Sequence, residues 1–236
     1  MKKTKIIIII SAWCFLLSSC KSWVPQEQCI SETSLMSAPS EEKLTKKIDA
    51  TECQNALELY QAFLCGEASY YDEAMEMEAT IAPGPDSEFT LFDMNGDGLP
   101  ELVTAFVIRQ YQDSSSNIVS TFTGGGIYSY KNKQVILWYD CLDIPFEILK
   151  NRALFFQYKK GDGGEYFDYV ELSDEGNAIS EVYGSKLYYQ QNDTVSFKYF
   201  INDNEVSISS WNNLMLFYRE LHTDIIPWHS YTQQKS

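Results

Sequence analysis

The strongest chemical signal in the chain is the segment Asp93–Leu102, Asp-Met-Asn-Gly-Asp-Gly-Leu-Pro-Glu-Leu. Oxygen-bearing side chains recur at alternate positions, and two glycines allow the backbone to turn sharply between them. A short loop of this kind suits Ca²⁺, a hard cation that takes roughly six to eight oxygen ligands and accepts backbone carbonyls among them. We therefore expect calcium rather than magnesium. The expected ligands are Asp93, Asn95, Asp97, Glu101 and the carbonyl oxygen of Leu99.

The spacing differs from that of an EF-hand, whose loop places a bidentate glutamate at position twelve. Position twelve counted from Asp93 is Thr104, and the segments on both sides have the composition of strands. We therefore expect an EF-hand-like loop between two strands. Its three carboxylates repel one another unless a cation lies between them. The alternative is an ordinary turn of Asn, Asp and Gly that binds no metal.

The motif resembles the calcium loop of FG-GAP and VCBS repeats, which lies between two strands of a β-propeller blade. Propellers repeat the motif in each blade, whereas this chain contains it once, and Gly161–Glu165 lacks the alternation of a second copy. The wider layout is similar to small Firmicutes-type surface lipoproteins of unknown function, with a short helix ending like Tyr60–Glu67, the loop, and Tyr-rich hairpins. This resemblance implies one structural calcium and carries over no catalytic residue.

Residue patterns that support catalysis are sparse. Both histidines, His222 and His229, are near the C-terminus, and neither a His-Glu-x-x-His nor a Gly-x-Ser-x-Gly motif occurs. We therefore favour a non-enzymatic module that binds a protein or a glycan, with an aromatic surface patch and no deep polar cleft. The alternative is a calcium-stabilised, glycan-directed hydrolase with paired carboxylates. It predicts two carboxyls facing each other across a cleft and one raised pKa.

Four cysteines follow residue 20, namely Cys29, Cys53, Cys65 and Cys141, and none forms a Cys-x-x-Cys metal motif. Cys53 and Cys65 fall on one predicted helix about 18 Å apart, at roughly 1.5 Å per residue, so they cannot be joined to each other. Two complete pairings remain open, Cys29–Cys53 with Cys65–Cys141 and Cys29–Cys65 with Cys53–Cys141. Fully reduced thiols are the third alternative.

The N-terminus has the organisation of a bacterial lipoprotein signal. Three lysines precede the apolar run Ile6–Leu17, which is too short for a stable membrane span. The following Leu17-Ser18-Ser19-Cys20 resembles a lipobox, in which the cysteine is lipidated and becomes the new N-terminus. We expect cleavage after residue 19 and acyl chains on Cys20 that anchor an extracytoplasmic protein to the membrane. The alternative is an ordinary secretory signal with a chance cysteine.

The charge of the chain limits its partners. Residues 1–19 hold three of the 18 basic residues and no acid, which leaves 15 basic and 33 acidic residues and a net charge of −18. Such a chain is repelled by nucleic-acid phosphates, and we find no basic patch interleaved with aromatic residues. We therefore expect no nucleic-acid partner.

Behind the signal, the sequence divides into a tether and one folded domain. Residues 20–47 are rich in Ser, Glu and Lys and show no sustained apolar period, which predicts a flexible tether after the lipidated cysteine. Residues 48–236 are expected to form a single α+β domain. Its first helix follows a capping box at Thr51 and Gln54 and ends at Gly66.

The rest of the domain is expected to be mainly β. Tyr71–Ala82 is ambiguous and suits a short acidic helix. Beyond it the apolar period changes to two, which is typical of strands. In Thr194–Ile201 the alternation predicts one buried face, and a last helix is capped by Ser209 or Ser210. Further turns are predicted at Lys131–Lys133, Lys159–Gly164, Asn192–Asp193 and Asn202–Glu205.

Short consecutive strands joined by tight turns pair antiparallel. A helix before them and a helix after them can cover the sheet that they form. The predicted fold is therefore an antiparallel β-meander sheet with an N-terminal and a C-terminal helix and a calcium loop between two strands.

Overall fold

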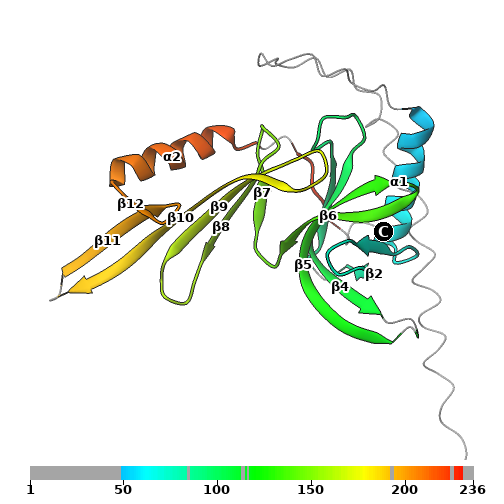
Figure 1. Cartoon of the computed structure of the whole chain (residues 1–236), viewed down its shortest axis with the longest axis horizontal. Coiled ribbons are helices and arrows are strands. Elements are labelled where there is room, and N and C mark those ends of the chain that lie inside the picture. Colours follow the sequence, from blue (N-terminus) through cyan, green and yellow to red (C-terminus); the bar gives the residue numbers. More distant parts are fainter. Residues whose placement is uncertain are drawn as a thin grey trace, which may run out of the picture.

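Two helices and thirteen strands form the part of the chain that the computed structural model describes, which is residues 49–83, 86–112, 115, 117–191, 194–223 and 226–230. Most of these residues are in strands, and the helices lie near the two ends of the described region (Figure 1). The predicted α+β class is confirmed. The signal, Cys20 and the tether lie outside the described residues.

Helix α1 spans Ala50–Leu64, and its N-cap lies two residues before the predicted cap. Asp49 is the N-cap, and its Oδ1 accepts a hydrogen bond of 3.1 Å from the amide of Thr51. The capping box at Thr51 is therefore wrong, because Thr51 is already helical and Asp49 supplies the acceptor that the free amides need. Gly66 follows the helix with a φ of +72°, as predicted for a C-terminal stop.

The first sheet contains a closed ring of strands. Its order is β13-β3-β4-β2-β1-β6-β5, and β4 also pairs with β5, so that β4, β2, β1, β6 and β5 close on themselves. All its pairs are antiparallel except β1 with β6, which is parallel. The strands are β1 (Tyr70–Asp72), β2 (Met77–Ala82), β3 (Glu88–Phe92), β4 (Glu101–Gln112), β5 (Ile118–Lys131), β6 (Gln134–Leu142) and β13 (His229–Ser230).

The ambiguous segment Tyr71–Ala82 is not a helix. It lies in the hairpin of β1 and β2, whose partners β6 and β4 hold it in the ring. Buried positions alternate along both strands, and Ala79 and Ile81 point into the core. Pairing on both sides therefore overrides the helix propensity of its Ala, Met and Glu residues.

The second sheet is the predicted antiparallel meander. Its order is β12-β11-β10-β9-β8-β7, so every strand pairs with its neighbour in sequence. The strands therefore form two sheets rather than one. The strands of this sheet are β7 (Phe146–Ile148), β8 (Leu154–Lys159), β9 (Glu165–Leu172), β10 (Ala178–Gln191), β11 (Thr194–Ile201) and β12 (Asn204–Val206).

Helix α2, Ile208–Leu221, lies across one face of the second sheet (Figure 1). Its N-cap is Ser207, whose Oγ accepts a 3.1 Å hydrogen bond from the amide of Ser210, so the predicted caps Ser209 and Ser210 are wrong. Strand β12 ends at Val206, and Ser207 is the first residue after it that carries a hydroxyl group. The short turn between β12 and α2 thus fixes the start of the helix.

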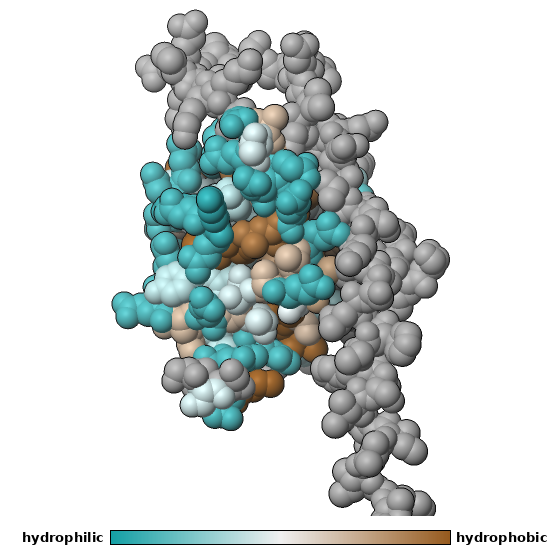
Figure 2. Space-filling model, turned by 90° about the vertical axis from the view of Figure 1, so that its right-hand side faces the viewer, coloured by the Kyte–Doolittle hydropathy of each residue, from teal (hydrophilic) through white to brown (hydrophobic). Residues whose placement is uncertain are grey.

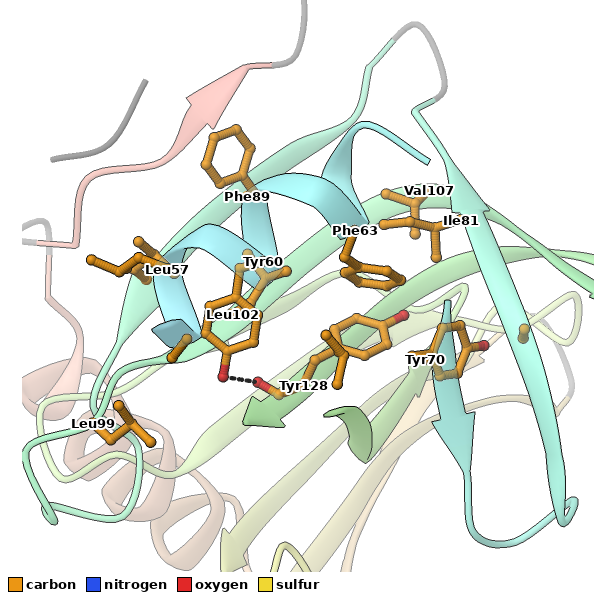
Figure 3. Close-up of a cluster of buried hydrophobic side chains, with 14 of the residues drawn as sticks. Leu57, Tyr60, Phe63, Tyr70, Ile81, Phe89, Leu99, Leu102, Val107 and Tyr128 are labelled. Atoms are coloured by element: carbon orange, nitrogen blue, oxygen red, sulfur yellow. Dashed lines mark hydrogen bonds between the residues drawn. The ribbon is translucent and has the colours of Figure 1, made fainter. Parts of the chain in front are cut away.

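Three buried clusters hold these elements together. The first lies between α1 and the ring, where the Phe63, Tyr70 and Tyr128 rings meet and the Tyr60 hydroxyl donates to the Tyr128 carbonyl at 3.2 Å (Figure 3). The second joins the two sheets through Val103, Ile127, Leu154, Phe156 and Val170. The third packs Trp211 and Tyr218 of α2 against Phe155, Phe167 and Tyr169.

The expected buried face of β11 is only partly buried. Tyr199 and Ile201 pack in the cluster under α2, whereas Val195 and Phe197 are 50% and 48% exposed. The outer half of the β10–β11 hairpin extends beyond α2 as an arm (Figure 1). Alternation therefore predicts which side chains share a face, but the length of α2 decides how many of them are covered.

Candidate calcium loop and adjoining cleft

The predicted calcium loop connects β3 to β4. These strands pair antiparallel up to Phe92 and Glu101, so the chain leaves and re-enters the sheet at adjacent positions. Gly96 and Gly98 have φ values of +77° and +92°, which side-chain-bearing residues rarely adopt. The expected position between two strands is confirmed, and the glycines are where the turn needs them.

Inside the loop, the predicted ligand side chains turn toward backbone amides. The two carboxylate oxygens of Asp93 accept from Gly96 at 2.7 Å and from Gly98 at 3.1 Å. Asn95 Oδ1 accepts from the Asp97 amide at 2.9 Å, and Asp97 Oδ1 accepts from the Leu99 amide at 2.8 Å. These bonds fix the shape of the loop.

Glu101 is the most buried member of the set. Its side chain is 3% exposed, and Oε2 accepts a 2.7 Å hydrogen bond from the amide of Met94. Burial, together with the charges of Asp97 and Asp93, raises the pKa of Glu101 to about 8. Burial also raises the pKa of Asp93, against the opposing charge of Arg152. For Asp93, burial thus outweighs the positive charge of Arg152.

The donor set has the chemistry that Ca²⁺ prefers, with three carboxylates, an amide oxygen and a backbone carbonyl. A carboxylate oxygen that accepts one N–H keeps a second lone pair for a metal. Across the described residues, however, no group of three or more His, Cys, Asp or Glu side chains is gathered around one point that would hold a metal ion. Calcium binding by Asp93, Asn95, Asp97, Leu99 and Glu101 therefore stays a prediction.

A cleft of about 820 Å³ adjoins this loop. Asn95, Asp97, Leu99 and Glu101 form part of its lining, and other walls come from the β1–β2 turn, from β6 and from the β9–β10 turn of the second sheet. The lining is rich in acids and aromatics. Beyond the loop it includes Asp72, Glu73, Asp140, Asp174, Glu175, Tyr130, Trp138 and Tyr139.

Two contacts fix the walls of the cleft. The Trp138 indole lies so close to Gly176 that an added Cβ would be 2.2 Å from a ring carbon, which ties β6 to the β9–β10 turn. Asp140 forms a 2.7 Å ion pair with Arg109, whose guanidinium is 3% exposed in the ring of strands. Burial of Arg109 makes this pair a fixed part of the wall rather than a mobile surface contact.

The cleft could not be predicted from the sequence. Its acidic residues are distributed from Asp72 to Glu175, and only the folded strands bring them together. The one local signal is Gly176, a glycine in the turn after β9 that permits the close approach of Trp138. Without the structure, this glycine is indistinguishable from an ordinary turn residue.

The histidines do not contribute to the cleft. His222 Nδ1 lies 2.8 Å from a carboxylate oxygen of Glu147, and His229 packs against Phe89 in the β13–β3 pair. Neither residue is among those that line the cleft. This arrangement agrees with the absence of a histidine-based catalytic motif in the sequence.

The cysteines follow neither complete pairing predicted from the sequence. Cys53 is disulfide-bonded, whereas Cys65 and Cys141 are thiols. Cys65 follows α1 and Cys141 is buried between the sheets, in a different cluster, so the fold keeps them apart. Of the predicted bonds, only Cys29–Cys53 remains compatible, and Cys29 lies outside the described residues. Burial also raises the pKa of the Cys141 thiol, which suppresses its reactivity.

The surface gives two further findings. No helix in the described ranges is long and apolar enough to cross a bilayer. The side of the molecule that carries α1 is mainly hydrophilic around a smaller apolar area (Figure 2).

Comparison of the chain with protein-family models, with curated proteins and with solved structures gave no match.

Proposed function

We propose that this chain is an extracytoplasmic lipoprotein, anchored to the bacterial membrane through Cys20, that binds a protein or glycan segment in the cleft beside a calcium loop. The observation that supports this most directly is the position of Asn95, Asp97 and Glu101 in the lining of the 820 Å³ cleft. Calcium on Asp93, Asn95, Asp97, Glu101 and the Leu99 carbonyl would neutralise this wall and fix its shape.

The lining suits recognition more than chemistry. Trp138 and Tyr139 offer flat apolar surfaces, and the surrounding carboxylates accept hydrogen bonds from hydroxyl or amide groups. Glu101, the carboxyl with the strongly raised pKa, is almost fully buried and hydrogen-bonded within the loop. A bound substrate would reach little of it, which favours a binding role over general acid catalysis.

The calcium proposal is tested by the melting temperature of the purified chain with excess calcium and with chelator. We expect calcium to raise it, because the ion binds the folded loop and not the unfolded chain. Asp97→Ala should lose most of this rise. Asp162→Ala is the matched control, since Asp162 also accepts an amide hydrogen bond in a turn, at 2.8 Å from Gly164. If calcium left the melting temperature of the wild type unchanged, the loop would be an ordinary turn.

The anchor is tested by fractionating cells that express the chain with and without Cys20→Ser. The wild type should stay with the membrane and the variant should leave it, because lipid on Cys20 is the proposed attachment. Mass spectrometry of the wild-type N-terminus then identifies the acyl chains. Equal membrane retention of both forms would refute the anchor while leaving the calcium proposal intact.

A glycan-directed hydrolase is the second candidate, and one observation favours it. The cleft is lined by several carboxyls, and the pKa of Glu101 is raised to about 8. Paired carboxylates of this kind support glycoside hydrolysis when one is protonated near neutral pH. The test is release of reducing ends from cell-wall and plant glycans by the wild type, Glu101→Gln and Asp140→Asn. Hydrolysis by the wild type that either variant abolishes would replace the binding proposal.

A further inference from the structure

The outer edge of β11 is open along half its length. On one side β11 pairs with β10 along its whole length. On the other side β12 covers only Tyr199–Ile201. Among the described strands, none pairs with this edge over residues 194–198. Backbone N–H and C=O groups at such an edge form hydrogen bonds readily with another extended chain.

Apolar side chains flank this open edge. Val195 and Phe197 project from the same face of β11, and the Phe197 ring meets that of Tyr188 on β10 at 6.0 Å between centroids. All three are about half exposed. An edge that combines free backbone groups with exposed apolar side chains is a site for strand addition.

We propose that this edge pairs antiparallel with the same edge of a second copy of the chain, about a two-fold axis at Ser196. In this register Val195 of each copy lies opposite Phe197 of the other, which makes the contact self-complementary. Both apolar pairs form on the face that carries Tyr188. The corresponding register on the outer edge of β10, centred on Tyr189, would place Tyr188 opposite Gln190 and gives a less apolar contact.

The charges of the arm allow this contact in a strongly acidic chain. The register places Lys198 opposite Thr194 and not opposite another lysine. Lys198 is also paired with Glu205 at 2.9 Å within its own chain, as Lys186 is with Glu165 at 2.9 Å. The arm extends away from the ring and α1 (Figure 1), so two copies would meet with their acidic clefts apart.

The test is disulfide trapping of the full chain in intact cells. Ser196→Cys places a thiol at the axis, where the two copies of residue 196 face each other at a distance that a disulfide spans. We expect a covalent dimer on non-reducing gels, with mass spectrometry identifying the 196–196 link. Ser209→Cys, exposed at the start of α2, is the control and should not cross-link.

The register is tested by exchanging charges in the Ser196→Cys chain. Val195→Glu or Phe197→Lys alone should lose the dimer, since each buries an unpaired charge in the contact. Co-expression of the two variants under different tags should restore a mixed dimer, because Glu at position 195 then faces Lys at position 197. Both positions are half exposed, so the variants should retain the wild-type melting temperature.

Three outcomes would overturn the proposal. The first is a 196–196 link no stronger than that of Ser209→Cys. The second is a link that persists unchanged in both single charge variants, which would place the contact elsewhere. The third is cross-linking of Ser196→Cys to a different protein, which would assign the edge to a foreign strand.

Discussion

Among single residues, Glu101 has the most unusual environment. Its carboxylate is buried at the end of an acidic loop, where it accepts a hydrogen bond from the amide of Met94. The negative charges of Asp93 and Asp97 act on it as well. Its folded-state pKa of about 8 lies above its ordinary value of 4.5. Because Glu101 keeps its proton in the folded chain up to a higher pH, the stability of the fold depends on pH. Binding of the proposed calcium would depend on the same proton, since the metal needs the ionised carboxylate.

Without calcium, we predict that the melting temperature falls as pH rises from about 5 to about 8. The raised pKa of Glu101 contributes stability that is fully present at a pH below its pKa in the unfolded chain. This stability is lost as the pH rises through its pKa in the folded chain. Calcium needs the ionised carboxylate, so the stabilisation by calcium should grow over the same range. Thermal unfolding in chelator and in calcium at both pH values measures the two trends. Glu101→Gln should flatten the chelator trend, leaving the smaller contribution of Asp93, and a wild-type trend of opposite sign would contradict the assignment.

The sequence predicted the loop but not this environment. The alternation of Asp93, Asn95 and Asp97 is local and is visible in any window of ten residues. Glu101 is the first residue of β4 and is buried there, and its charge contributes to the raised pKa of Tyr60, which is distant in sequence. A pattern of residue types carries no information on such long-range packing.

Among the elements, the loop between β3 and β4 depends on a glycine for its backbone conformation. Gly96 has a φ of +77°, and a Cβ at this position would lie 2.0 Å from Nη1 of Arg152. The glycine therefore serves both the turn and the close approach of the segment before β8. Arg152 in turn gives the acidic loop a positive neighbour.

We predict that Gly96→Ala lowers the free energy of unfolding by more than about 1 kcal/mol, because a side chain is strained at the positive φ of this position. Gly161→Ala is the matched control. No atom lies within 4 Å of a Cβ added there, so this variant should change stability little. Urea unfolding of both variants gives the comparison. Equal losses of stability in the two variants would mean that the positive φ of Gly96 does not contribute to the stability of the fold.

Element ends and types were harder to predict than element existence. Both helices occur where apolar spacing indicated them, but their caps are Asp49 and Ser207, each two or more residues before the predicted caps. Several hydroxyl and carboxyl residues compete for each cap, and tertiary contacts choose among them. The turn at Asn192–Asp193 lies outside the described residues, whereas the strands on either side of it pair as predicted.

At the scale of the whole molecule, one buried cluster joins the two sheets. Val103 and Ile127 of the ring pack against Leu154, Phe156 and Val170 of the meander. The cleft is bounded by residues of both sheets, so its shape depends on this contact. Local strand patterns predicted the hairpins, but they gave no indication that the strands would divide into two sheets, because that division depends on pairings between distant segments.

We predict that Phe156→Ala lowers the free energy of unfolding by about 3–5 kcal/mol, the usual loss for a buried phenylalanine. Because the cluster joins both sheets, the chain should still unfold in one transition at a lower denaturant concentration. Phe217→Ala, on the exposed side of α2, is the control and should cost less than about 1 kcal/mol. Two separate transitions in the wild type would show that the sheets unfold independently.

The parallel pair of β1 and β6 also determines the order in which the chain can fold. Tyr70 pairs with Val135, about 65 residues later, whereas every hairpin of the meander joins neighbours in sequence. During the proposed export of the chain, β1 would therefore stay without this partner until β6 had also crossed the membrane. Such long-range closure is slow relative to local hairpins. Ring closure should thus be the late step of maturation, and the interval before it is when the nascent chain is most exposed to proteases and to misassembly.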